Sequence, residues 1–204
     1  MKFLEIAGNQ NKGSDWITIR DKEVSDKFGL KQNCILHDVT DLPLDINDNF
    51  FVGIYSEHFI EHLEKEQGIN FLKEMYRILK PGGIIRTVWP SMDFVDFLRS
   101  DKDLSDTYFV KAYYNRFVLK YGYAPPDSRD KPLQEQCALS LLYQAGEHKH
   151  LWYKQELIDK LKEIGFVKVN ECEYQQSSFL PFNNIDTPGR IRQVHSAVVE
   201  AWKE

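Results

Sequence analysis

One short stretch of the chain concentrates side chains that can bind metals or transfer protons. It reads YSEHFIEHL from Tyr55 to Leu63 and places His58, Glu61 and His62 within five residues. Histidine titrates near neutral pH and is also a common ligand of transition metals. A histidine three residues before a Glu-His pair has the spacing of one type of zinc signature. The stretch could therefore be a metal site or a proton-transfer site.

A zinc site makes two demands that the sequence does not meet near this stretch. It needs a third protein ligand, and it would carry both histidines on a helix. The stretch instead follows the apolar run 51–55, which is typical of a strand. We therefore expect no metal, with His58 facing a cleft at the end of the strand. We expect His62 to pack or hydrogen-bond under the helix that follows.

The surrounding sequence alternates strand and helix patterns. Apolar runs predict strands over 2–7, 16–20, 34–37, 51–55 and 84–89. Between the last two lies a helical apolar pattern, which Pro81, Gly82 and Gly83 bring to a stop. Strand, helix, turn and strand in this order predict a βαβ unit, and hence a parallel sheet covered by helices.

The rest of the chain divides into an aromatic-rich segment and one more helix with two strands. Residues 91–147 are rich in Phe and Tyr, and we expect a helical insertion over the carboxyl edge of the sheet, where open α/β folds bind ligands. The alternative is that these rings pack the insertion's own core. A helix is predicted over 154–164, and strands over 167–173 and 194–202.

Composition limits the class of protein. A length of 204 residues fits one domain over 1–204, with 91–147 as its insertion. No apolar run approaches the roughly 18 residues of a membrane span, and the N-terminus lacks a signal-peptide pattern, so we expect a cytoplasmic protein. The cysteines Cys34, Cys137 and Cys172 are scattered and are expected to be small core residues. A net charge of -5 argues against broad nucleic-acid binding.

The span from His37 to Trp89 carries a resemblance to a known family. The string HDVTDLPLDINDNFFVGIYSEHFIEHL, followed by FLKEMYRILKPGGIIRTVWP, resembles the central part of class I S-adenosylmethionine-dependent methyltransferases. It is closest to small predicted methyltransferases of surface-polysaccharide gene clusters. The later HKHLWYKQELIDKLKEIGF resembles the same group's stretch before its last two strands.

The resemblance implies a fold and a cofactor. The fold is an α/β, Rossmann-like three-layer sandwich with a mostly parallel sheet and an antiparallel last strand. Here its first crossover helix is shortened or absent, and a helical insertion follows strand five. The cofactor is S-adenosylmethionine, with S-adenosylhomocysteine as product. The residues that the resemblance places beside it are Glu5, Ala7, Gly8, Asn9, Asp21, Asp38, Val39, Ser56, Glu57 and His58.

Asp38 has the position of the family's acidic side chain near the adenine amino group. A carboxylate that accepts from an exocyclic amine makes a charge-assisted hydrogen bond. The alternative is that Asp38 caps the segment that follows it.

The sequence also departs from the family pattern. The first strand runs into LEIAGNQNKGSDW in place of the usual G-x-G-x-G turn, and the connection to Trp16 is too short for the usual crossover helix. Arg20 stands where the family has an acidic residue for the ribose, with Asp21 beside it. Val52 replaces an aspartate of the fourth strand. The altered turn and Arg20 favour a second hypothesis, a catalytically degenerate methyltransferase fold that serves as a binding or scaffolding subunit, whereas Asp38, Ser56 and His58 favour an active enzyme.

The leading hypothesis is methyl transfer to a small-molecule or sugar acceptor. His58 is the first candidate for a general base. His148, His150 and Tyr153 are weaker candidates, and the alternative for the two histidines is a solvated loop. A nicotinamide-dependent oxidoreductase is a third hypothesis, disfavoured because the sequence lacks G-x-G-x-x-G. The acceptor's identity and the oligomeric state do not follow from these residues.

Overall fold

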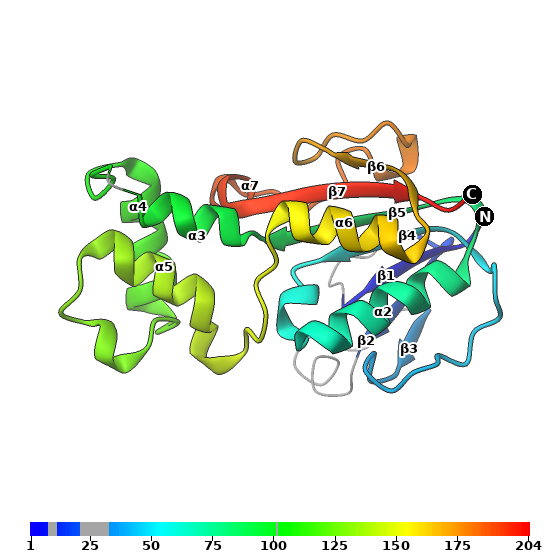
Figure 1. The fold of residues 1–204 in the computed structure, drawn as a ribbon, viewed down its shortest axis with the longest axis horizontal. Coiled ribbons are helices and arrows are strands. Elements are labelled where there is room, and N and C mark those ends of the chain that lie inside the picture. The colour runs from blue at the N-terminus through cyan, green and yellow to red at the C-terminus, as the bar shows by residue number, and fades with distance from the viewer. Residues whose placement is uncertain (8–11, 21–32, 101) are drawn as a thin grey trace.

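Seven strands form the central sheet, in the order β3-β2-β1-β4-β5-β7-β6 (Figure 1). The structure is a computed structural model that describes residues 1–7, 12–20, 33–100 and 102–204. The strands are β1 (Phe3–Ile6), β2 (Trp16–Arg20), β3 (Cys34–Leu36), β4 (Phe51–Glu57), β5 (Leu79–Pro90), β6 (Val167–Glu171) and β7 (Ser196–Trp202).

Strands β1 to β5 pair in parallel, and β7 runs antiparallel between β5 and β6. The predicted mostly parallel sheet with an antiparallel last strand is therefore confirmed. Residues 7–15 join β1 to β2, fewer than the dozen or so of a usual parallel crossover. Part of this connection, residues 8–11, lies outside the described residues. The five parallel carboxyl ends share one edge, where sheets of this kind bind ligands.

Helices cover one face of the sheet and extend beyond its carboxyl edge (Figure 1). The α-helices of the described residues are α2 (Lys65–Ile78), α3 (Met92–Leu98), α4 (Tyr108–Tyr113), α5 (Leu133–Tyr143), α6 (Lys154–Ile164) and α7 (Arg190–His195). The shorter helical turns are η1 (Ile60–His62), η2 (Tyr114–Lys120), η3 (Pro126–Ser128), η4 (Gln144–Gly146) and η5 (Leu180–Phe182). Leu72 of α2 and Leu161 of α6 belong to the same buried apolar cluster as Leu4 and Ile6 of β1. This apolar burial fixes both helices on the same face.

The linker between β6 and β7 covers the opposite face of the sheet. Phe182 of this linker is fully buried, in a cluster with Phe3 of β1 and Tyr55 of β4. Gly53 leaves room for the Phe182 ring, because a Cβ at position 53 would lie 2.9 Å from Phe182 Cζ. The linker therefore acts as a packed layer of the fold, and not as a loose connection.

Gly53→Ala should destabilise the protein by about 1–3 kcal/mol, the usual range for overpacking a core. The reason is the contact between the added methyl group and the Phe182 ring. Urea denaturation followed by circular dichroism would measure the change. In a double variant with Phe182→Leu the cost of the added methyl group should shrink. If the losses of stability in the two single variants simply added up in the double variant, the proposed contact between the added methyl group and the Phe182 ring would be contradicted.

The structure corrects several predicted boundaries. β5 already begins at Leu79, so Pro81 and the glycines lie within the first part of this strand, where Gly82 has a φ of +76°. The last strand begins at Ser196, because residues 190–195 form α7. β6 ends at Glu171 and not at residue 173. None of the described helices has the length and hydropathy that a membrane span requires.

The insertion lies beyond the carboxyl end of β5, as predicted (Figure 1). Phe94 of α3, Tyr113 of α4 and Leu141 of α5 form its own buried core. Phe97 and Tyr108 are instead 44% and 77% exposed. The expectation that the rings pack the insertion's own core therefore applies to some of them only.

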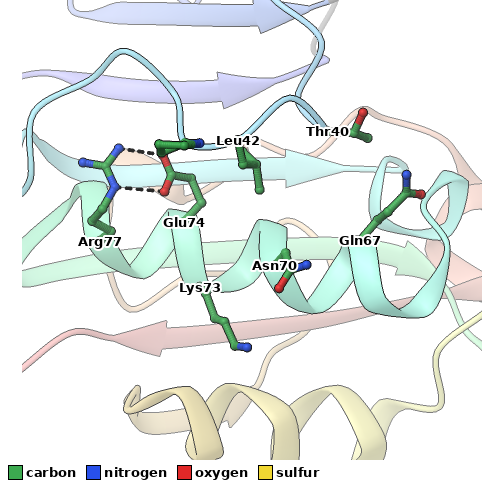
Figure 2. A pocket seen from close by; sticks show the side chains of 8 residues that line it. Thr40, Leu42, Gln67, Asn70, Lys73, Glu74 and Arg77 are labelled. Atoms are coloured by element: carbon green, nitrogen blue, oxygen red, sulfur yellow. Dashed lines mark hydrogen bonds and ion pairs between the residues drawn. The ribbon is translucent and has the colours of Figure 1, made fainter.

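Arg77 fastens the segment that follows β3 to α2 (Figure 2). Its guanidinium donates hydrogen bonds to the Glu74 carboxylate and to the carbonyl oxygens of Leu44 and Ile46. A surface groove of about 550 Å³ runs between this segment and α2. It has no lining residue from the carboxyl end of β1, β4 or β5, so we do not assign the chemistry to it.

Candidate functional site

Two adjacent strands turn sharply where they reach the carboxyl edge. Ala7 follows β1 with a φ of +53°, and His58 follows β4 with a φ of +51°. The two turns are neighbours, because Ile6 pairs with Ser56 in the parallel register. A non-glycine residue in the left-handed region costs free energy, and such residues gather at functional sites. The backbone therefore takes a costly left-handed conformation at the point where the sequence predicts a bound cofactor.

Three of the residues predicted to bind the cofactor, Gly8, Asn9 and Asp21, lie outside the described residues. Ala7 is half-buried, and its backbone N–H donates to the Ile19 carbonyl at 2.8 Å. Arg20, at the end of β2, is fully buried.

The side chain of Glu5 in β1 is buried and already has partners within the protein. Its carboxylate is 2% exposed, lies 3.4 Å from the Lys12 ammonium and accepts a hydrogen bond of 3.1 Å from Thr18 Oγ1. Lys12 also lies over the ring of Tyr55, at 4.6 Å from its centroid. Glu5 therefore supports the turn between β1 and β2 by anchoring Lys12.

Asp38 lies exposed after β3. One carboxylate oxygen, Oδ1, accepts from the Thr40 backbone N–H at 2.9 Å and from Thr40 Oγ1 at 2.7 Å. The Thr40 hydrogen bonds hold the pKa of Asp38 below its usual value, so the group is ionised at neutral pH. The alternative, that Asp38 caps the segment after it, therefore holds for the oxygen Oδ1. The other oxygen, Oδ2, has no hydrogen-bond partner among the described residues. The next residue, Val39, has its side chain in the main core.

Ser56 and Glu57 end β4 in different surroundings. Ser56 is fully buried, and its Oγ has no hydrogen-bond partner within the described part of the chain. Glu57 accepts hydrogen bonds from the Tyr174 hydroxyl at 2.9 Å and from the Thr187 backbone N–H at 3.1 Å. Burial opposes its ionisation, but the bonds from Thr187 and Tyr174 and the nearby His58 hold its pKa below the usual value. Glu57 therefore ties β4 to the linker.

A cavity of about 250 Å³ lies between the strand ends and the insertion. Four imidazoles line it, together with two carboxylates, one guanidinium and the rings of the insertion. The polar members are His58, His62, His148, His195, Glu61, Glu147 and Arg192, and the aromatic ones are Tyr113, Phe117 and Tyr123. This density of titratable groups in one concave site is typical of a functional pocket.

His58 joins the strand end to this cavity. Its Nε2 lies 3.0 Å from Ser196 Oγ, and its Nδ1 lies 3.4 Å from Glu61 Oε1. Its side chain is 19% exposed, and its ring packs edge-on against His195 at 5.4 Å. The structure therefore places His58 in the cleft at the end of β4.

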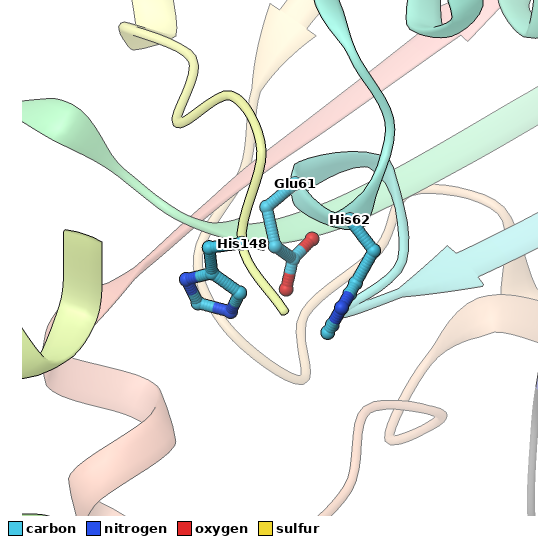
Figure 3. A group of neighbouring side chains, drawn as sticks. All are labelled: Glu61, His62 and His148. Atoms are coloured by element: carbon cyan, nitrogen blue, oxygen red, sulfur yellow. The ribbon is translucent and has the colours of Figure 1, made fainter. Parts of the chain in front are cut away.

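The surroundings of Glu61 were not foreseen from the sequence. Figure 3 shows its carboxylate between the rings of His62 and His148, whose centroids are 5.0 Å apart. Glu61 is fully buried, which opposes its ionisation, but the nearby imidazoles of His58, His62 and His148 hold its pKa below the usual value. Burial holds the pKa of His148 below its usual value, so this ring is neutral near pH 7.

Two expectations about the histidines are corrected. His62 was expected under the helix that follows, but it lies on the cavity wall, because η1 turns it toward His148. His148 was expected in a solvated loop as the alternative, but it is only 9% exposed. His150 instead packs on Trp152, and the Tyr153 hydroxyl donates to Asp96 on the outside of the insertion. The only sequence signal for His148 was the HKH string.

Comparisons with known proteins agree with this architecture. Residues 12–87 match the family model described as a methyltransferase domain. This match spans less than half of the chain and shows a likeness to methyltransferase domains. No curated protein matches it significantly.

Solved structures share the methyltransferase fold at low sequence identity. A SAM-dependent methyltransferase from Archaeoglobus fulgidus superposes with a TM-score of 0.57 at 17% identity, over 99% of this chain and 86% of that chain. A protein from Pyrococcus horikoshii superposes with a TM-score of 0.56 at 13% identity, over 100% of this chain and 82% of that chain. A SAM-dependent methyltransferase from Thermotoga maritima gives 0.52 at 15% identity, over 100% and 82%. The predicted fold is thereby confirmed, and a methyltransferase domain supports methyl transfer in general.

Proposed function

We propose that this methyltransferase domain transfers a methyl group from S-adenosylmethionine to a hydroxyl of a small polar acceptor or a sugar. The observation that carries the proposal is the pair of left-handed turns at Ala7 and His58, on adjacent strand ends, with His58 lining the cavity. These turns lie at the carboxyl edge, where α/β sheets bind ligands.

The described residues fit an adenosyl cofactor at this edge. Asp38 Oδ2 is an ionised, exposed acceptor that suits the adenine amino group. Ser56 at the end of β4 remains a proposed contact; its Oγ is fully buried and has no hydrogen-bond partner among the described residues. Gly8, Asn9 and Asp21 remain proposed contacts. Glu5, Val39 and Glu57 would contribute through the backbone and by holding the turns, because their side chains are engaged elsewhere.

The cavity suits a small acceptor. Its volume of about 250 Å³ lies just below the range of roughly 300–1,000 Å³ that is usual for ligand pockets. A single sugar or a molecule of similar size fits that space, and the imidazoles and the Arg192 guanidinium offer partners for its hydroxyls.

His58 would act on the acceptor proton. When bound, the cofactor supplies an electrophilic methyl group and a sulfur that keeps the electrons of the broken carbon–sulfur bond. His58 Nε2 would take the proton of the acceptor hydroxyl as its oxygen attacks, and His58 Nδ1–H would face Glu61. Holding the two reactants in line contributes up to about 7–11 kcal/mol to such a reaction.

One observation favours the second hypothesis, a binding or scaffolding subunit. The carboxylates of Glu5 and Glu57, which a cofactor could use, are already bound to Lys12, Tyr174 and Thr187. A subunit of this kind would keep the fold and bind no S-adenosylhomocysteine.

Calorimetric titration with S-adenosylhomocysteine separates the two hypotheses. We expect one binding site per chain, and Asp38→Ala should weaken binding by about tenfold or more, since a hydrogen bond to a charged group is lost. Asp41→Ala is the matched control, because Asp41 is also exposed in the same turn. Absence of binding to the wild-type protein at millimolar ligand would refute the proposed function.

A further inference from the structure

We propose that Glu61, His62 and His148 form a binding site for a divalent transition-metal ion of the zinc type, open toward the cavity. The three side chains each offer one ligand atom, and these atoms lie within 4.8 Å of one another (Figure 3). Two imidazoles and one carboxylate are the ligand set of zinc sites that keep a fourth position open.

The Glu61 carboxylate lacks the partners that a buried anion requires. It is fully buried, and neither oxygen has a hydrogen-bond partner among the described residues. Its nearest cationic candidate, His58 Nδ1, lies at 3.4 Å from Oε1 without the geometry of a hydrogen bond. Buried charges are usually paired or bound to a metal, because leaving them unpaired costs several kcal/mol. A bound cation would neutralise this charge and give one of the two oxygens a partner.

His148 is oriented as a metal ligand. Its Nδ1 makes a short hydrogen bond with the Leu141 carbonyl oxygen, so Nδ1 carries the proton. Its Nε2 is then unprotonated and carries a lone pair. This nitrogen is buried and has no hydrogen-bond partner in the described ranges. A metal-binding histidine typically donates its other ring N–H to a carbonyl in this way, which fixes the ring.

Backbone contacts hold the distant segments together. The Glu61 carbonyl oxygen accepts hydrogen bonds from the backbone N–H groups of Lys149 at 2.9 Å and His150 at 3.2 Å. This pair of hydrogen bonds, called the backbone clamp below, holds the segment around His148 against η1. A tetrahedral ion with bonds of about 2.1 Å needs ligand atoms about 3.4 Å apart, so modest side-chain rotations would close the site.

The ion would have a direct use in the cavity. A metal with an open position binds an oxygen and lowers the pKa of its proton. At this site it would hold the acceptor oxygen beside His58. Metal binding itself does not require the proposed methyl transfer.

Titration of the metal-free full chain with Zn²⁺ alone tests the site. We expect one ion per chain by calorimetry, and a visible absorption spectrum when Co²⁺ replaces Zn²⁺. His62→Gln and His148→Gln should each weaken binding by more than about 100-fold, because a direct ligand matters more than its supporting partners, which alter affinity by about 10–100-fold. His150→Gln is the matched control and should bind as the wild type does.

Two results would overturn the inference: no stoichiometric Zn²⁺ binding by the wild type, or wild-type affinity in His62→Gln. His62 is only half-buried, so this variant keeps the test valid if His148→Gln fails to fold. Titration of the same preparations with S-adenosylhomocysteine separates the two proposals. Zn²⁺ binding without nucleoside binding would refute the proposed function alone, and the reverse would refute the metal site alone.

Discussion

Arg86→Met should lower the free energy of unfolding by about 3–5 kcal/mol, the usual cost of breaking a buried ion pair. Arg86 of β5 is fully buried, as are its partners Asp186 and Glu200. Its Nε donates to Asp186 Oδ1 at 2.9 Å, and its Nη1 donates to Glu200 Oε1 at 2.7 Å. The variant would leave two buried carboxylates without their cation.

The same guanidinium also holds the linker over the sheet. It donates to the carbonyl oxygens of Gln176 at 2.9 Å and Glu173 at 3.3 Å, so all five of its N–H donors are used. Urea denaturation followed by circular dichroism would measure the loss. Arg129→Met is the control, since Arg129 is exposed and its loss should cost little. Equal stability of the two variants would show that Arg86 does not anchor the linker.

His58→Ala should lower kcat by about 100- to 10,000-fold, the range that a general base contributes. The ring connects the β4 end to the cavity, and none of the other imidazoles that line this cavity directly follows a parallel strand. Affinity for S-adenosylhomocysteine should change little, because the loss falls on proton transfer. Radiolabelled methyl transfer to candidate sugars and small hydroxyl compounds would measure the rate.

His58→Gln is the more selective variant of this test. Glutamine keeps a polar contact with Ser196 but cannot accept a proton, so its rate should fall with that of His58→Ala. His150→Ala should keep the wild-type rate, because that ring packs on Trp152. Full activity in either His58 variant would remove this residue from the mechanism.

The fold could be predicted from local sequence, because each main element carries its own pattern. Apolar runs placed β1, β2 and β4, and the helical periodicity placed α2 and α6. The boundaries of β5 and β7 were wrong where local signals were ambiguous. The glycines after Pro81 fit both a turn and the irregular start of a strand, and residues 194–195 fit both a strand and the end of α7.

The site was only partly predictable, because it depends on contacts between distant segments. His58 could be found, since it directly follows a strand. The approach of His148 to Glu61 depends on a backbone clamp from the end of the insertion, which leaves no local pattern. The partners of Glu5 and Glu57 also come from other segments. A charged residue within an apolar strand, as at Arg86, was the one available signal for buried ion pairs.

A crystal structure of the protein soaked with S-adenosylhomocysteine tests the central claim most directly. We predict density for the nucleoside at the carboxyl edge of the sheet, with adenine beside Asp38 and sulfur facing the cavity beyond His58. Density that shows the space between Ala7 and Ser56 filled by the protein's own side chains at saturating ligand would contradict the claim.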